Sequence, residues 1–205
     1  EDTRGFFNEF PFVDILVHGE GEYIIENIFK VFLEDKDWSK VKGISTKLFS
    51  TTPQERINNL TDLPSPYLTN LIWDLVDKNS QVDWDTSWET NRGCPFRCTF
   101  CAWGMASHDI VSRLNIDITL EEIKYIGERT KVNNWIICDA NFGILKRDVE
   151  IAKAIRKVHD EYHYPRKCDI WLSKNTTDRN LEIAEILGDM INPVMAIQSM
   201  TEEVL

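Results

Sequence analysis

From Ser87 onward, short apolar segments alternate with longer amphipathic ones, and this alternation constrains the fold more than any other feature. The apolar segments have the length and the β-branched or aromatic residues of strands. The segments between them repeat apolar residues at helical spacing. Strands separated by helices pair in parallel, because each helix carries the chain back to the end of the sheet where the previous strand began. The predicted strands are Ser87–Thr90, Trp135–Cys138, Ile170–Leu172 and Val194–Ile197.

Helix start signals lie between these strands. Thr119 and Glu122 have the spacing of a capping box, which predicts a helix from Thr119 through Arg129. Asp148 can cap a second helix, and Asp178 starts a third. The apolar positions of the third helix are Leu181, Ala184 and Leu187. The sequence therefore predicts an α/β protein whose four strands form a parallel sheet or a partial (βα) TIM-like barrel.

The beginning of the chain predicts a strand, a tight turn and a helix. Phe12–Val17 is apolar and rich in β-branched residues, and His18 and Gly19 end it. Helical spacing after Gly21 predicts one apolar face, formed by Ile24, Ile25, Ile28, Phe29 and Phe32. We expect residues 1–35 to close an α/β domain, residues 36–85 to form a linker interrupted by prolines, and residues 86–205 to begin the barrel.

Charge and hydropathy exclude several classes of protein. The chain has 23 Lys and Arg against 34 Asp and Glu, a formal net charge of −11, which disfavours nucleic acid as a partner. The longest apolar run, near Phe12–Val17, is too short to span a bilayer, and no secretory signal is evident. We expect a cytoplasmic protein with no membrane partner. The absence of an initiator Met and the stop at Leu205 predict a piece of a longer protein.

The cysteines indicate metal or redox chemistry. Of the five cysteines, Cys94, Cys98 and Cys101 lie within eight positions, while Cys138 and Cys168 stand apart. An odd number of cysteines, clustered in this way, suits metal binding in a reducing compartment better than a disulfide framework. Cys138 and Cys168 are expected to be buried strand residues, because free cysteine is among the most buried residue types.

The three clustered cysteines have the spacing C-x3-C-x2-C and follow a predicted strand directly. Their thiolates can converge on one side of a compact loop, and such thiolates hold iron–sulfur clusters, usually four to a cubane. Three ligands leave one metal position open to a small molecule. Structural zinc is the alternative, with Cys138 or Cys168 as the fourth ligand, and inert cysteines are a further one. The spacing favours an iron–sulfur cluster.

At these residues the sequence resembles the radical S-adenosylmethionine (SAM) superfamily, whose signature is C-x3-C-x2-C with an aromatic residue, here Phe100, before the third cysteine. The resemblance implies that Cys94, Cys98 and Cys101 bind a [4Fe–4S] cluster and that SAM, next to Phe100, chelates the unique iron. Reduction by a partner such as flavodoxin or ferredoxin then cleaves SAM to methionine and a 5′-deoxyadenosyl radical.

Two further stretches, Ser87–Phe96 and Asp139–Gly143, resemble the cobalamin (B12)-binding branch of this superfamily. The resemblance implies a radical SAM barrel preceded by the end of a Rossmann-like cobalamin-binding domain. It also implies a cobalamin-dependent methyltransferase, or a related radical modification, acting on a small-molecule or otherwise unidentified substrate. In this superfamily the end of the second barrel strand contacts the amino group of SAM, a position occupied here by Asp139 and Asn141.

Other candidate contacts follow from position within the same resemblance. Lys174 and Gln198 follow the third and fourth predicted strands, at the end of a barrel where active sites collect, and are candidate SAM contacts. Gly19–Glu22 resembles the turn that closes the cobalamin-binding domain, which makes Gly19, Glu20, Gly21 and Glu22 candidate cobalamin contacts. His18 is not assigned as a lower axial ligand, because the usual histidine motif is absent from this sequence.

Two other functions compete with the enzyme. An iron–sulfur electron carrier would need a fourth protein ligand and would not cleave SAM. A zinc-stapled binding module would hold zinc and show no cluster absorption. Metal analysis and a SAM-cleavage assay separate the three.

Overall fold

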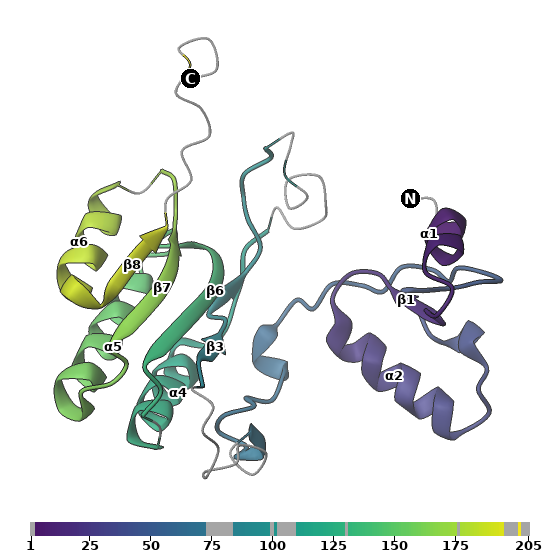
Figure 1. Ribbon diagram of the computed structural model, residues 1–205, viewed down its shortest axis with the longest axis horizontal. Coiled ribbons are helices and arrows are strands. Elements are labelled where there is room, and N and C mark those ends of the chain that lie inside the picture. Colours follow the sequence, from purple (N-terminus) through teal and green to yellow (C-terminus); the bar gives the residue numbers. More distant parts are fainter. Residues whose placement is uncertain are drawn as a thin grey trace. The chain divides into compact units, whose positions relative to one another are not determined.

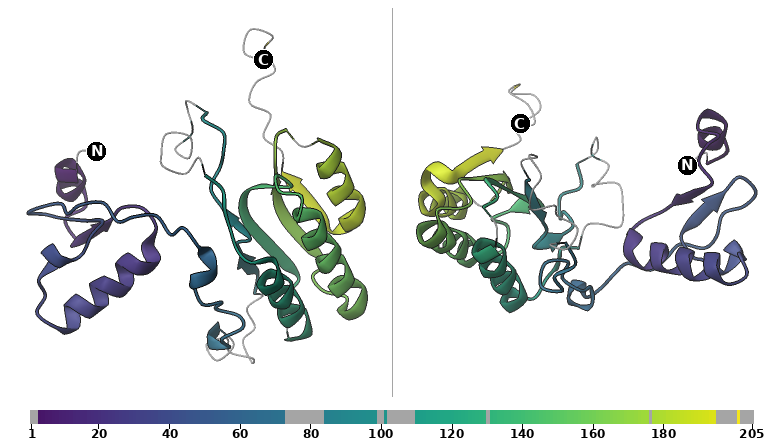
Figure 2. Two further views of the ribbon diagram at one scale, coloured as in Figure 1. Left: turned by 180° about the vertical axis from the view of Figure 1, so that it is seen from behind. Right: turned by 60° about the horizontal axis from the view of Figure 1, so that its bottom comes forward.

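The computed structural model describes residues 3–72, 84–98, 101, 110–129, 131–175, 177–194 and 201. The chain divides into two compact units, residues 1–58 and 59–205, which Figures 1 and 2 show in several views. The segment 36–85, predicted to be a linker, is therefore shared between the two units. Each unit is described by itself below.

The second unit is built on a four-stranded parallel sheet with the order β3-β6-β7-β8 (Figure 1). Helices alternate with these strands along the chain, as the sequence predicted, so the α/β class with a parallel sheet is confirmed. The strands are β3 (Thr86–Trp88), β6 (Asn134–Phe142), β7 (Lys167–Leu172) and β8 (Ile191–Val194). The helices are α4 (Ile116–Arg129), α5 (Asp148–Tyr162) and α6 (Thr177–Leu187), followed by the short helix η3 (Gly188–Met190).

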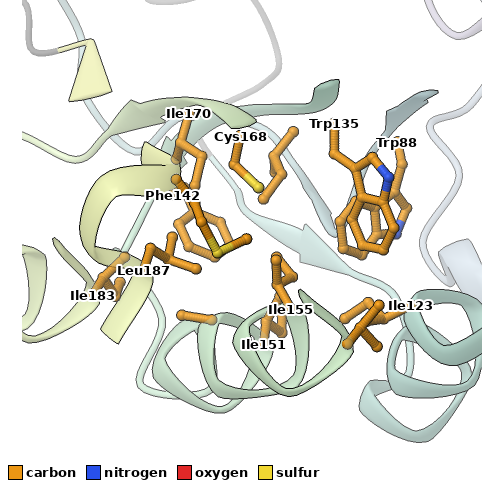
Figure 3. Packing of buried hydrophobic residues seen from close by; sticks show 14 of the residues in the cluster. Trp88, Ile123, Trp135, Phe142, Ile151, Ile155, Cys168, Ile170, Ile183 and Leu187 are labelled. Atoms are coloured by element: carbon orange, nitrogen blue, oxygen red, sulfur yellow. The ribbon is translucent and has the colours of Figure 1, made fainter. Parts of the chain in front are cut away.

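The hydrophobic core of this unit lies between the sheet and helices α4, α5 and α6 (Figure 3). Alternate residues of each strand point toward the helices, because successive side chains of a strand face opposite sides of the sheet. Trp135 and Ile137 of β6 and Ile155 of α5 are almost fully buried, and burial of each such side chain contributes roughly 1.5–3 kcal/mol. Trp135 also packs edge-to-face on Trp88, with ring centroids 5.9 Å apart.

Helix α4 begins three residues before the predicted start. The side chain of Asn115 accepts a hydrogen bond from the Asp117 backbone N–H (2.8 Å), which satisfies a free donor of the first turn. Thr119 instead donates its hydroxyl to the Asn115 carbonyl, and Glu122 is buried. The capping-box prediction was wrong because Asn115, an equally good cap, precedes Thr119 by one helical turn.

The other predicted elements are found with shifted details. Helix α5 begins at Asp148, but this carboxylate accepts from the backbone N–H groups of Gly143 (2.8 Å) and Leu145 (2.9 Å), so it closes the preceding turn. Leu181 of α6 is 58% exposed, whereas Ile183 is buried. Strand β8 starts at Ile191, and residues 195–197 of the predicted strand lie outside the described residues.

The first unit contains α1 (Thr3–Glu9), β1 (Ile15–Val17), α2 (Gly21–Leu33), η1 (Trp38–Lys40) and β2 (Ile44–Thr46). Strands β1 and β2 pair antiparallel. The predicted apolar face of α2 was partly wrong. Ile24 is buried together with Val31, but Phe29 is 63% exposed. The misassignment arises because apolar residues cover more than one side of this helix, and Val31, seven positions after Ile24, shares its face.

The second unit contains two smaller features beside the sheet and its helices. The segment with η2 (Leu60–Asp62) continues to Tyr67, whose hydroxyl donates to the Ser87 carbonyl of β3 (2.5 Å). Strands β4 (Asn91–Arg92) and β5 (Ser112–Arg113) form an antiparallel ribbon. Among the described residues, no helix is both long enough and apolar enough to cross a membrane.

Candidate functional site

The three clustered cysteines follow β4 directly. Gly93 separates them from the strand and has a φ of +118°, a backbone conformation that glycine adopts without steric cost. Later in the loop, the backbone N–H of Cys101 donates to the carbonyl of Cys98 (3.1 Å). The cysteine loop, residues 93–101, therefore leaves the ribbon by a glycine turn, and a backbone hydrogen bond joins its third cysteine to its second.

All three cysteines of the loop are free and half-buried. Within the described part of the chain, no three His, Cys, Asp or Glu side chains are gathered in an arrangement that could hold a metal ion. Convergence of the three thiolates thus stays a prediction. The chemistry of the donor set still fits, because free thiols at this spacing are iron–sulfur ligands. Phe100 lies outside the described residues.

Asp139 ties strand β6 to the start of the cysteine loop. Its side chain is 1% exposed, and both oxygens accept hydrogen bonds from residues far away in the sequence. One oxygen accepts from the backbone N–H groups of Thr90 (2.7 Å) and Asn91 (3.0 Å). The other accepts from the Thr90 hydroxyl (2.5 Å) and the Asn91 amide (2.6 Å). The protein itself therefore occupies the carboxylate that was expected to contact SAM.

The burial of Asp139 changes its acidity. Burial raises the pKa of this carboxyl to about 7, although the hydrogen bonds from Thr90 and Asn91 act to lower it. The pairing of β6 with β7 is irregular between Ile137 and Phe142, the stretch that contains Asp139. Such irregularities re-aim side chains and occur next to active sites. The sheet thus deviates from regular pairing where it supports the loop.

Arg147, which sequence analysis missed, braces the same ribbon from the turn after β6. Its guanidinium donates to the carbonyls of Leu114 (2.5 Å) and Thr90 (2.6 Å). Thr90 directly precedes β4, and Leu114 directly follows β5. The Leu114 backbone N–H also donates to the Thr90 carbonyl (3.0 Å). No sequence signal distinguishes Arg147 from Lys146, because its partners are more than thirty positions distant. Asp139 and Arg147 together fix the base of the ribbon.

Asn141 lies two positions beyond Asp139 on β6. Its side chain is 3% exposed, and its amide nitrogen has no hydrogen-bond partner among the described residues. A buried amide donor without a partner costs free energy unless a ligand or water satisfies it. Asn141 is thus the predicted SAM contact on β6 that keeps an unused hydrogen-bonding group.

Lys174 joins the cysteine loop from the end of β7. Its ammonium lies 3.6 Å from Sγ of Cys98 and 5.7 Å from the centroid of the Phe96 ring. The structure thus brings this predicted SAM contact to the loop itself. Gln198 lies outside the described residues, so its predicted role is not addressed.

The two isolated cysteines lie on opposite faces of the sheet. Cys168 is fully buried, as predicted, and burial raises the pKa of its thiol to about 12. Cys138 is exposed, so the prediction that it is buried was wrong. Its neighbour Ile137 points into the core, and the alternation of the strand turns Cys138 to the other face. An apolar run does not reveal which of its residues face the helices.

The candidate cobalamin turn, Gly19–Glu22, lies at the start of α2. Gly19 has a φ of +91°, and, apart from Gly19 itself and its two chain neighbours, no described residue has an atom within 4 Å of the position that a Cβ would occupy. The Glu20 side chain is 6% exposed and accepts from the backbone N–H of Ile57 (2.5 Å) and from Arg56 (3.4 Å). Gly21 and Glu22 form the first turn of α2. The turn leaves open space beside its backbone, while Glu20 is engaged within the unit.

The fold and the site together define an α/β protein with a three-cysteine loop beside the carboxyl ends of its parallel strands. No protein-family profile matches the chain. It is 34% identical to a cobalamin-dependent radical SAM methyltransferase, TokK, of Streptomyces tokunonensis. It is 36% identical to 2-(S-pantetheinyl)-carbapenam-3-carboxylate methyltransferase of Streptantibioticus cattleyicolor. Each match covers 98% of this chain and 31% of the relative, so the chain spans about a third of these proteins.

Solved structures share the fold. The cobalamin-dependent SAM radical enzyme OxsB, solved with aqua-cobalamin bound, matches with a TM-score of 0.66 and 20% identity over 100% of this chain and 30% of its own. The radical SAM methyltransferase TsrM from Kitasatospora setae matches with a TM-score of 0.63 and 16% identity over 96% of this chain and 40% of its own. Over almost its whole length the chain is thus similar to enzymes of the cobalamin-binding branch of the radical SAM superfamily, in agreement with the sequence resemblance.

Proposed function

We propose that this chain is part of a cobalamin-dependent radical SAM methyltransferase. The observation that carries the proposal is the three-cysteine loop, set directly after a strand of an α/β unit, in a chain that matches such methyltransferases over 98% of its length. In this proposal residues 86–205 begin a radical SAM barrel, residues 36–85 lead into it, and residues 1–35 end a Rossmann-like cobalamin-binding domain.

Cys94, Cys98 and Cys101 would hold a [4Fe–4S] cluster and leave one iron for SAM. When bound and reduced, such a cluster would supply the electron for cleavage of SAM to methionine and a 5′-deoxyadenosyl radical. Asn141 would donate its unpaired amide N–H to an oxygen of the bound nucleotide. Asp139 would act at one remove, because its hydrogen bonds to Thr90 and Asn91 hold the strand that carries the loop.

The Gly19–Glu22 turn would contact cobalamin, which serves as a carrier of the methyl group. Its fit rests on Gly19, where the open space at the missing Cβ lets a bulky ligand approach the backbone closely. Glu20 would hold the turn in place through Ile57 and Arg56. In this proposal the backbone of the turn, more than the Glu20 carboxylate, faces the ligand.

The competing functions need a fourth protein ligand for the metal. Cys168 is a poor candidate, because it is fully buried in the core and its raised pKa disfavours the thiolate that metals bind. A zinc-stapled module would need a fourth ligand beside the three cysteines of the loop. The donor set therefore supports an open-site cluster over structural zinc.

The proposed substrate is a small molecule of the carbapenam carboxylate class, after the substrate printed in the name of one relative. We expect the full-length protein, reconstituted without oxygen and supplied with cobalamin, SAM and a strong reductant, to release 5′-deoxyadenosine. With 2-(S-pantetheinyl)-carbapenam-3-carboxylate present, we also expect a methylated product. Both are measured by mass spectrometry.

Cys98→Ala should lose the cluster and SAM cleavage completely, because two thiolates do not hold a cubane. Cys138→Ser is the matched control. This cysteine is exposed on the sheet, so the variant should keep the iron content of the wild type. A wild-type protein that holds iron yet releases no 5′-deoxyadenosine would defeat the proposal in favour of an electron carrier.

A further inference from the structure

We infer that Lys174 is a positioning residue that acts through Cys98 to set how readily the proposed cluster is reduced. The inference rests on the proposed iron–sulfur site and assigns Lys174 a role different from contact with SAM. It is carried by the position of the Lys174 ammonium at a sulfur of the cysteine loop.

Lys174 touches the loop at two points. Its ammonium lies 3.6 Å from Sγ of Cys98, a distance compatible with an N–H···S hydrogen bond, and 5.7 Å from the Phe96 ring centroid. Phe96 and Cys98 are two positions apart in the loop, while Lys174 is 76 positions away from Cys98. No carboxylate of the described residues forms a salt bridge with Lys174. The positive charge of Lys174 therefore lies beside the cysteine loop and is not neutralised by a carboxylate of the described residues.

The backbone beside Lys174 is fixed. Ser173, the preceding residue, is fully buried, and its N–H donates to the Phe142 carbonyl of β6 (2.8 Å). Its own carbonyl accepts from the Asn180 amide of α6 (2.6 Å). The stem of the lysine thus starts from a rigid point between β6 and α6. A side chain held in this way keeps its charge at one place, which a tuning role requires.

Charge and hydrogen bonds at the sulfur ligands set the reduction potential of an iron–sulfur site. One electron from an external low-potential reductant adds one negative charge to the site, and no bond forms or breaks in that transfer. The Lys174 cation favours the more negative, reduced state over the oxidised one. Without it, the same reductant would leave a smaller fraction of the protein able to cleave SAM.

The test compares Lys174→Met, Lys174→Gln and Lys174→Arg in the full-length protein, reconstituted without oxygen. Iron and sulfide content are measured first, and a redox titration followed by electron paramagnetic resonance then gives the midpoint potential in the absence of SAM. For Lys174→Met we expect about a tenfold shift toward the oxidised form, equal to about 59 mV for a one-electron couple. Lys174→Arg should have a midpoint potential close to that of the wild type, because arginine keeps the charge.

Lys167→Met is the matched control, because Lys167 is an exposed lysine at the opposite end of the same strand, β7. Its potential should equal that of the wild type. The dissociation constant for SAM is measured in parallel and should change less than about twofold in Lys174→Met. A raised dissociation constant with an unchanged potential would make Lys174 a SAM ligand and overturn the inference.

Three other results separate this inference from the proposed function. Loss of iron from both Lys174→Met and Lys174→Gln, with Lys174→Arg fully loaded, would show that the lysine assembles the site, and would overturn a role in tuning it. A wild-type protein that takes up no iron would overturn the proposed function, and the inference with it. A loaded wild type and a loaded Lys174→Met with equal potentials would overturn the inference alone.

Discussion

The cysteine loop and the Gly19–Glu22 turn begin alike but are held differently. Each follows a short strand through a glycine with a positive φ. The cysteine loop is fixed at its base by Asp139, which accepts four hydrogen bonds from residues 48 and 49 positions away. In the Gly19–Glu22 turn, the Glu20 carboxylate accepts from the Ile57 N–H and from Arg56, which lie in the same unit. The difference teaches that the start of the cysteine loop is tied to the sheet through Asp139 of β6, whereas Glu20 ties its turn to the segment at Arg56 and Ile57.

The largest expected effect is at Asp139. Asp139→Ala leaves the buried N–H groups of Thr90 and Asn91 without an acceptor, which costs about 3 kcal/mol of the free energy of unfolding. We also expect reduced iron uptake, because the strand entering the loop loses its support. Urea unfolding and iron analysis of the reconstituted protein measure the two effects. An unchanged free energy of unfolding would show that the network is dispensable.

A second effect at Asp139 concerns pH. Burial raises the pKa of Asp139 to about 7 from its ordinary 3.8, so the folded state binds this proton more tightly than the unfolded chain does. The resulting stabilisation is complete below about pH 4 and is lost as the pH rises toward 7. Burial raises the pKa of Glu122 and of Asp148 in the same direction. The free energy of unfolding should therefore decline across this range.

Asp139→Asn isolates that contribution. This variant removes the ionisable group, so the decline between about pH 4 and about pH 7 should be shallower than in the wild type. Urea unfolding at several pH values gives the two slopes. Equal slopes in the two proteins would assign the pH dependence to other carboxyls and remove Asp139 from the account.

The smallest expected effect is at Glu20. Glu20→Gln keeps an acceptor for the Ile57 N–H but loses the charge, at a cost of about 1 kcal/mol, and should leave iron uptake unchanged. Glu26→Gln is the control, because Glu26 pairs with Lys30 on the exposed side of α2 and should cost less than ~0.5 kcal/mol. If Glu20→Gln lowered iron uptake as much as Asp139→Ala, the contrast between the two anchors would fail.

The sequence predicted the order and type of the elements because these depend on local pattern. Alternating apolar and amphipathic segments placed the four strands of the parallel sheet, although β8 begins at Ile191, three residues earlier than expected. Local pattern was weaker at boundaries. Asn115 and Thr119 are both capping residues one turn apart, and only the structure shows that Asn115 opens α4.

The sequence predicted which residues belong to the candidate site better than it predicted what each of them contacts. The spacing of Cys94, Cys98 and Cys101 was visible in the sequence, since it lies within eight positions. The partners of Asp139 were not, because no pattern links a strand residue to a loop 48 positions away. Lys174 was expected near SAM from its place after a strand, and its contact with Cys98 depends on how β7 and the loop meet.

The hydrogen bonds to Asp139 have a consequence for any ligand that binds at the loop. They immobilise Thr90 and Asn91, so Gly93 is the first position with wide rotational freedom before the cysteines. A ligand that binds at the cysteines therefore has to order mainly the short segment after Gly93, because the chain before Gly93 is already fixed. The conformational entropy lost on binding is correspondingly small, which leaves more of the interaction energy to appear as affinity.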